Sequence, residues 1–186
     1  MRPRIRQTAF VCTVMVLVLM AVLPLSGSAQ VPSGKEVVSP SVYASYDPVA
    51  RGANMQVAVV MKIRPGFHVN AREVTESYLI RTDLKTEAPA GFKVGEVAYP
   101  KGTLQTFTFA KNKKLNVYTD SVTLHVPVTV LPDAPLGAQQ VPMKLRYQAC
   151  SSEICLPPVT LSVDAAVNVV ADAKSARPAN RSFFAQ

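Results

Sequence analysis

The stretch MQVAVVMKI at residues 55–63 decides the fold class. Its larger apolar side chains, Val57, Val59, Met61 and Ile63, alternate with neighbours that are mostly small or polar. An alternation with a period of two is typical of a β-strand with one buried face, whereas an amphipathic helix repeats every 3.6 residues. The stretch therefore predicts a strand in a sheet that is covered on one side.

The same period-two pattern recurs from residue 40 to residue 170. Clusters of Pro, Gly, Asn and Asp, which favour turns, separate the apolar segments. The expected strands are residues 41–46, 55–63, 78–84, 92–99, 104–109, 122–130, 141–147 and 159–170. Because no convincing helix lies between them, parallel βαβ units are excluded, and the sequence predicts an all-β antiparallel sandwich.

Residues 1–29 have the pattern of a secretory signal peptide. Three arginines in the first six residues precede an uncharged, mostly apolar run at residues 8–25, and small residues end the segment at Ala29. We expect cleavage before Gln30. The alternative is an uncleaved membrane anchor, because a run of this length is at the short limit for crossing a bilayer. In both cases the folded part is exported, to the periplasm or an equivalent compartment.

The rest of the chain divides into three parts. Residues 30–38 are expected to be a flexible segment, and residues 39–170 a single sandwich domain. Residues 171–186 are rich in Ala, Asn, Ser and Arg, so a disordered tail is expected there. Phe183 and Phe184 are the two tail residues that could dock on the domain.

Charge and motifs exclude several functions. The 186 residues carry a formal charge of +8, and removing the first 29 residues deletes three arginines and no acid, which leaves +5. The remaining basic residues are scattered, without an aromatic platform beside them, so nucleic acid is a poor candidate partner. Hydrolase motifs and a glycine-rich phosphate loop are absent. We therefore expect no hydrolase or nucleotide chemistry and no cofactor.

Two of the three cysteines lie close together. Cys12 falls in the apolar run, whereas Cys150 and Cys155 have four residues between them and lie between two expected strands. Such a spacing lets the pair form a disulfide at the mouth of a hairpin. A ring this small stabilises a fold by only about 2 kcal/mol in the loop-closure estimate, so it can open without unfolding the domain. Spacing alone equally allows a plain structural disulfide in an exported protein.

Neighbouring residues add weaker signals. Pro157 stiffens the chain just after the second cysteine, and Glu153 disfavours a thiolate beside it. The histidines, His68 and His125, could join the two cysteines in a metal site, and three strand methionines could add soft copper ligands. Histidines and methionines in alternating strands are more often structural, so we expect no metal.

Two sequence blocks carry a family resemblance. The first is YQAC at residues 147–150 followed by CLPP at 155–158, and the second is PGFHVNA at 65–71 followed by YLIRT at 78–82. Together they resemble the N-terminal periplasmic domain of the transmembrane disulfide reductase DsbD, a disulfide-bond corrector domain. The resemblance covers residues 39–170.

The resemblance implies an immunoglobulin-like sandwich that carries electrons by thiol–disulfide exchange. Such a domain receives reducing equivalents from a membrane disulfide reductase and passes them to thioredoxin-fold proteins in the periplasm. Cys150 and Cys155 would then be the redox pair, and Phe107 or Phe109 would be the aromatic lid of a cap loop. Cytochrome c biogenesis is one process that such a relay would serve.

Other positions differ from the family pattern or adjoin it. In the family, polar aromatic residues follow the glycine, and the corresponding residues here are His68 and Asn70. Tyr147 begins the block that contains the first cysteine. The acidic residues before the cap aromatic are replaced by Gln105 and Thr106. We therefore expect this chain to differ from the family more in its choice of partner than in its redox pair. The chain holds neither a membrane-spanning reductase nor a C-terminal thioredoxin domain, so the electron donor is expected to be a separate chain.

A second class of function stays open at this stage. It is a non-catalytic, immunoglobulin-like binding module that holds a structural hairpin disulfide and contacts a protein or a copper ion. The sequence does not decide which sulfur is attacked first, in which direction electrons flow, or how many copies assemble.

Overall fold

The structure, a computed structural model, describes residues 31–184. The expected signal segment, residues 1–29, lies outside this range, so it stays a prediction. Across residues 31–184, no helix combines the length and the apolar character that a bilayer crossing requires.

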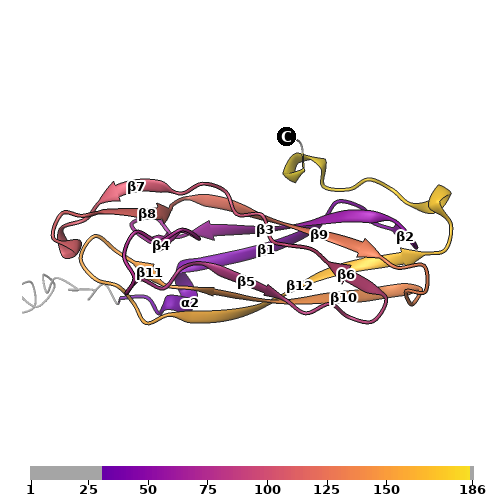
Figure 1. Cartoon of the computed structure of the whole chain (residues 1–186), viewed down its shortest axis with the longest axis horizontal. Coiled ribbons are helices and arrows are strands. Elements are labelled where there is room, and N and C mark those ends of the chain that lie inside the picture. Colours follow the sequence, from indigo (N-terminus) through magenta and orange to yellow (C-terminus); the bar gives the residue numbers. More distant parts are fainter. Residues whose placement is uncertain (1–30, 185–186) are drawn as a thin grey trace, which may run out of the picture. The chain divides into compact units, whose positions relative to one another are not determined.

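Strands dominate the described part of the chain (Figure 1). One helical turn, α2 (Gly34–Val37), precedes them, and three short 3-10 turns, η2 (Thr108–Ala110), η3 (Ala173–Ser175) and η4 (Arg181–Phe183), lie among and after them. The strands are β1 (Val38–Ala44), β2 (Val49–Ala50), β3 (Asn54–Ile63), β4 (His68–Asn70), β5 (Asp83–Thr86), β6 (Phe92–Val94), β7 (Thr103–Thr106), β8 (Lys114–Tyr118), β9 (Ser121–Val130), β10 (Gly137–Tyr147), β11 (Ala149–Cys150) and β12 (Val159–Val170).

Two four-stranded sheets form the sandwich. Their strand orders are β1-β3-β9-β6 and β2-β12-β10-β5. The long strands bury alternate side chains between the sheets, among them Val57, Val59 and Met61 from β3 and Val141 and Leu145 from β10. The expected all-β, immunoglobulin-like antiparallel sandwich is confirmed. One detail differs, because β2 pairs with β12 in parallel over two residues.

The expected strand limits hold best for the long strands. β3, β9 and β12 agree with the expected segments within one residue at each end. The segment 78–84 is wrong over most of its length, because β5 begins only at Asp83. The strands β4 and β11 were not predicted, since two or three residues are too few to show an alternation.

The expectation of a flexible segment at residues 30–38 is wrong from Ser33 onward. The backbone N–H of Ser33 donates to the Glu36 carboxylate at 2.7 Å, which forms a capping box at the start of α2. Val37 and Val38 are buried in the core, and the buried Tyr147 hydroxyl donates to the carbonyl of Gly34 at 2.8 Å. The segment is therefore an integral part of the sandwich.

The expectation of a disordered tail at residues 171–186 is also wrong over the described part, residues 171–184. The backbone N–H of Ala179 donates to the Ser45 carbonyl at 2.9 Å, and the Asn180 side chain donates to the Ala44 carbonyl at 2.9 Å. The tail therefore runs alongside the end of β1.

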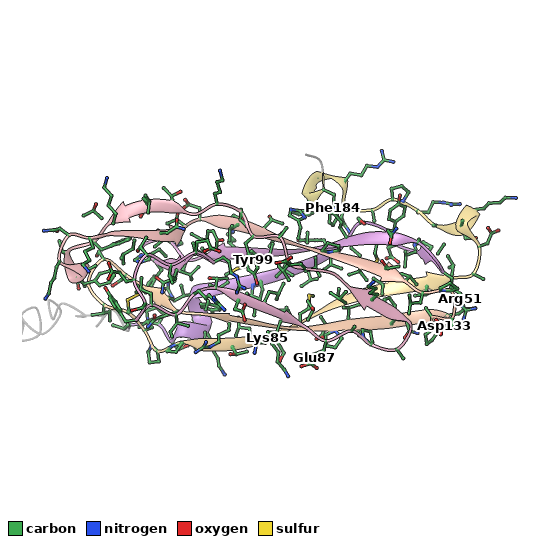
Figure 2. The ribbon with its side chains drawn as sticks, in the orientation of Figure 1. Arg51, Lys85, Glu87, Tyr99, Asp133 and Phe184 are labelled. Carbon is green, nitrogen blue, oxygen red and sulfur yellow. A yellow bond between two sulfur atoms is a disulfide. The ribbon has the colours of Figure 1, made fainter. Side chains whose placement is uncertain are left out.

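The two tail phenylalanines explain this order. Phe183 stacks on Tyr43 with ring centroids 4.1 Å apart, and Phe184, labelled in Figure 2, lies edge-on to His125 at 6.0 Å. Tyr43 and His125 are the two register partners of Ala58 in β3, which is fully buried. The tail thus covers the outer face of this sheet at Ala58, and partial burial of the two rings offsets part of the entropy lost on ordering.

Replacement of Tyr147 by Phe tests how firmly the N-terminal turn is held. The change removes the hydroxyl and leaves a buried carbonyl at Gly34 without that partner. The free energy of unfolding is expected to fall by about 1–2 kcal/mol, measured by urea denaturation. Tyr78→Phe is the matched control, because the Tyr78 side chain is 62% exposed and should tolerate the same change. Equal stability of the two variants would contradict the assignment.

Candidate functional site

A third, smaller sheet lies at one end of the sandwich (Figure 1). Its strand order is β11-β4-β8-β7. In the pairing of β11 with β4, Cys150 stands opposite His68 and Ala149 stands opposite Val69. Side chains that face each other across an antiparallel pair share one face of the sheet, with Cβ atoms about 4.5–5.5 Å apart. The pairing therefore places the His68 ring beside the Cys150 side chain.

Cys150 and Cys155 form a disulfide, with their Cα atoms 3.9 Å apart. The backbone N–H of Ser151 donates to the Ile154 carbonyl at 2.8 Å, and the Ser151 hydroxyl accepts backbone N–H groups within the loop. Cys150 is fully buried, whereas Cys155 is half-buried and Ile154 is 47% exposed. The two sulfurs therefore belong to residues of very different accessibility.

Gln148 ties the cysteine loop to the rest of the site. Its side-chain oxygen accepts from Asn70 Nδ2 and from the backbone N–H of Ile80, both at 3.3 Å. Its side-chain nitrogen donates to the carbonyl of Leu156 at 3.3 Å. Asn70 is fully buried and also donates to the Ile80 carbonyl at 3.0 Å. Sequence reasoning gave no role to Gln148, although it lies inside the block that carried the resemblance.

His68 lies under two aromatic rings. Its ring is stacked on Phe107, with centroids 4.0 Å apart, and is nearly parallel to Phe109 at 6.2 Å. The residue is 3% exposed, and its Nε2 atom is buried without a hydrogen-bond partner. Burial lowers the pKa of His68 to about 4 because it disfavours the charged ring. His68 is therefore uncharged at neutral pH.

The two phenylalanines belong to the segment between β7 and β8. Phe107 and Phe109 pack on a small apolar cluster, separate from the main core, that includes Leu79, Leu115 and Val117. The segment also reaches the cysteine loop, because the Thr108 hydroxyl donates to the carbonyl of Ser152 at 3.4 Å. This long hydrogen bond links the two loops across the face of the site.

A cavity of about 360 Å³ opens beside these rings. His68 and Phe107 line it together with Ser152 from the cysteine loop, and Arg64 and Asp120 are its charged lining residues. The cavity leads from the surface to the stacked rings, so a visiting group can approach the site from this side.

The remaining candidate residues lie apart from the ring stack. Tyr147 is buried and bonded to Gly34, and burial raises its pKa to about 12, so it belongs to the scaffold. Glu153 and Pro157 are exposed on the cysteine loop and just after it. His125 lies in β9 opposite Ala58, so the two histidines and the two cysteines do not assemble as one metal site. Among the described residues, no cluster of three or more His, Cys, Asp or Glu could hold a metal ion.

The family model for the N-terminal region of the thiol:disulfide interchange protein DsbD matches residues 35–166. The chain belongs to this family. It is thus a DsbD N-terminal-type domain, a thiol–disulfide interchange domain with a cysteine pair. A comparison with curated protein sequences finds no match.

Two solved structures are similar to this DsbD N-terminal-type domain. One is the Neisseria meningitidis DsbD N-terminal domain in the reduced form, with 19% identity, a TM-score of 0.48, and coverage of 82% of this chain and 98% of that one. The other is the N-terminal periplasmic domain of ScsB from Proteus mirabilis, with 15% identity and a TM-score of 0.46. That match covers 66% of this chain and 44% of the ScsB chain.

The buried histidine makes the stability of this DsbD-type domain depend on pH. The pKa of His68 is about 4 in the folded state and 6.5 in an unfolded chain, so between these values the unfolded chain binds the extra proton. Stability is therefore complete above about pH 6.5 and falls as the pH decreases. The His68 contribution lost between pH 6.5 and pH 5 is about 2 kcal/mol. Urea unfolding across this range should show a steeper loss for the wild-type protein than for His68→Phe, and parallel curves would contradict the assignment.

Proposed function

We propose that this domain passes reducing equivalents between a membrane disulfide reductase, present as a separate chain, and thioredoxin-fold proteins in the periplasm. The observation that carries the proposal is the disulfide between a fully buried Cys150 and a half-buried Cys155, held in a short loop at one end of a complete sandwich. Membership of the DsbD N-terminal family supports this reading. Export of the chain is part of the proposal.

Accessibility supports Cys155 as the sulfur that partners attack. An incoming thiolate must approach along the S–S axis, and only Cys155 belongs to a partly exposed residue. Attack there forms a mixed disulfide between Cys155 and the donor, while Cys150 leaves as a thiolate. A second donor thiolate then breaks the mixed disulfide, so two electrons and, after protonation, two protons end on Cys150 and Cys155.

Transfer to the acceptor runs through the same intermediates in reverse. The Cys155 thiolate attacks the disulfide of a thioredoxin-fold protein, and the acceptor's other sulfur leaves as a thiolate. The Cys150 thiolate then attacks Cys155, which restores the internal disulfide and releases the acceptor as a dithiol. In the restored ring the Cα atoms of the two cysteines are 3.9 Å apart.

The segment that carries Phe107 and Phe109 acts in this proposal as a cap. Both rings lie over His68, the register partner of Cys150, and Thr108 bonds to the cysteine loop. A cap of this kind shields the pair from small thiols and moves aside when a partner docks. Because Gln105 and Thr106, which precede the cap, are uncharged, shape and apolar contacts around the cap select the partner in this proposal.

Trapping a mixed disulfide tests the proposal. A thioredoxin-fold protein whose resolving cysteine is replaced by Ser, and whose remaining cysteine is loaded with thionitrobenzoate, should form a covalent adduct with the reduced Cys150→Ser variant. The Cys155 thiolate attacks the loaded cysteine sulfur, and thionitrobenzoate is the leaving group. The Cys155→Ser variant should form at least about tenfold less adduct, because its remaining sulfur belongs to a buried residue. Non-reducing electrophoresis and mass spectrometry measure both outcomes.

The double variant Cys150→Ser, Cys155→Ser is the control for the scaffold. It should stay folded and lose about 2 kcal/mol of stability, as expected for a ring of about six residues, while it forms no adduct at all. If the oxidised wild-type protein gives no adduct with the single-cysteine partner in its thiol form, and its disulfide resists reduction until the sandwich unfolds, the binding-module alternative is the correct one.

Phe107→Ala tests the cap. Loss of the stack on His68 should raise the rate at which dithiothreitol reduces the disulfide by up to about tenfold, since an aromatic pair holds the closed state by about 0.5–1.5 kcal/mol. Leu136→Ala is the control, because Leu136 is 51% exposed and lies just before the opposite end of β10. An unchanged rate in Phe107→Ala would rule out shielding by this ring.

A further inference from the structure

The Nε2 atom of His68 is a buried polar atom without a hydrogen-bond partner in the disulfide form. Leaving such an atom unpaired costs about 1–3 kcal/mol. The ring nevertheless stays 97% covered by its neighbours, between the Phe107 ring and the sheet, opposite Cys150. An unpaired atom at this place indicates that its partner appears in another state of the site.

Reduction supplies that partner. A disulfide sulfur carries no proton and can donate nothing to Nε2. When the bond opens, Cys150 becomes a thiol, and its S–H is a donor that lies across the strand pair from the imidazole. The sulfur remains buried, so solvent offers it little help in losing its proton.

We propose that His68 is a catalytic residue whose Nε2 atom pairs with the Cys150 thiol in the reduced domain and accepts its proton when Cys150 restores the internal disulfide. This inference deepens the proposed exchange function and rests on it. It assigns His68 to the buried sulfur only, and the attack by Cys155 on a partner does not need it.

The Cys150 thiol transfers its proton to His68, giving a thiolate and an imidazolium side by side. The thiolate attacks Cys155 Sγ in the mixed disulfide, the Cys150–Cys155 bond forms, and the bond from Cys155 to the acceptor sulfur breaks. The electron pair leaves on that acceptor sulfur, which takes the proton from the imidazolium. Cys150 and Cys155 are oxidised together, and the acceptor disulfide is reduced.

The surroundings leave the ring free to accept a proton, and because a pKa of about 4 makes it a weak base, the transfer is coupled to the attack of the sulfur on Cys155. Burial keeps the ring uncharged at neutral pH, so one ring nitrogen has a free lone pair. The charged groups around it are Arg64 and Asp120 on the cavity wall, with Glu153 exposed on the cysteine loop. The rings above it, Phe107 and Phe109, carry no competing hydrogen-bond donor, and Cys150 is the residue that stands opposite His68 in the strand pair.

The test follows both sulfurs of the full, reduced protein with Ellman's reagent in a stopped-flow instrument. The first release of thionitrobenzoate reports attack by Cys155, and the second reports closure of the ring by Cys150. In His68→Phe, which keeps a ring for the stack on Phe107, the second phase at pH 7 should be at least about tenfold slower, while the first phase is unchanged. Above the ionisation range of a free thiol, the two proteins should converge, because Cys150 then ionises without help.

Two further variants keep the test decisive. His68→Gln retains an acceptor and should recover part of the second phase, which a purely structural role of the ring would not predict. His125→Phe is the matched control, since His125 also carries a buried unpaired nitrogen but lies in β9 away from Cys150. The single-cysteine variants assign the two phases to their sulfurs.

The outcomes separate this inference from the exchange function. An unchanged second phase in His68→Phe, or a slowing that is equal at every pH, overturns the role of His68 while exchange with a thioredoxin-fold protein remains intact. Absence of a mixed disulfide with any thioredoxin-fold partner overturns the exchange function, even if Ellman's reagent still shows two phases.

Discussion

The short pairing of β4 with β11 joins two parts of the chain that are distant in sequence. It sets Cys150 opposite His68, and β4 also pairs with β8, which pairs with β7. The cap segment lies between β7 and β8, so the same small sheet supports the disulfide, the buried imidazole and the aromatic rings. Gln148 fixes this arrangement, because its side chain bonds both to Asn70 in β4 and to Leu156 beyond the disulfide. The geometry of the site therefore depends on a few ladder positions and one amide.

The sequence predicts the long elements well because they contain enough residues for an alternation to appear. β4 and β11 are too short for that, and they were found only as blocks that resemble a family. β8 was not predicted either, because three lysines and an asparagine at residues 111–114 hide its start. Positive φ angles at Lys111 and Asn112 turn the chain there, the strand begins at Lys114, and its buried positions are Leu115, Val117 and Tyr118. The stack on His68 and the role of Gln148 depend on contacts between distant segments, which spacing along the chain does not contain.

The position of the tail is explained by one residue of β3, whose burial only the structure reveals. Ala58 occupies an outward position in β3, yet it is fully buried, because its register partners Tyr43 and His125 carry Phe183 and Phe184 of the tail. The composition of residues 171–186 suggested disorder, because an average over the whole segment gives little weight to its two phenylalanines. An outer sheet face that is apolar at its centre needs a cover, and here the chain supplies it from its own C-terminal segment.

The disulfide ring contributes nothing to the ladders of the two large sheets, since the pairing of β10 with β12 stops at Tyr147 and Val159. Substitutions in the cysteine loop or in the cap consequently leave the main core as it is. The cysteine loop and the cap can therefore vary in sequence to fit new partners while the two large sheets stay unchanged, as antibody loops vary on a constant framework.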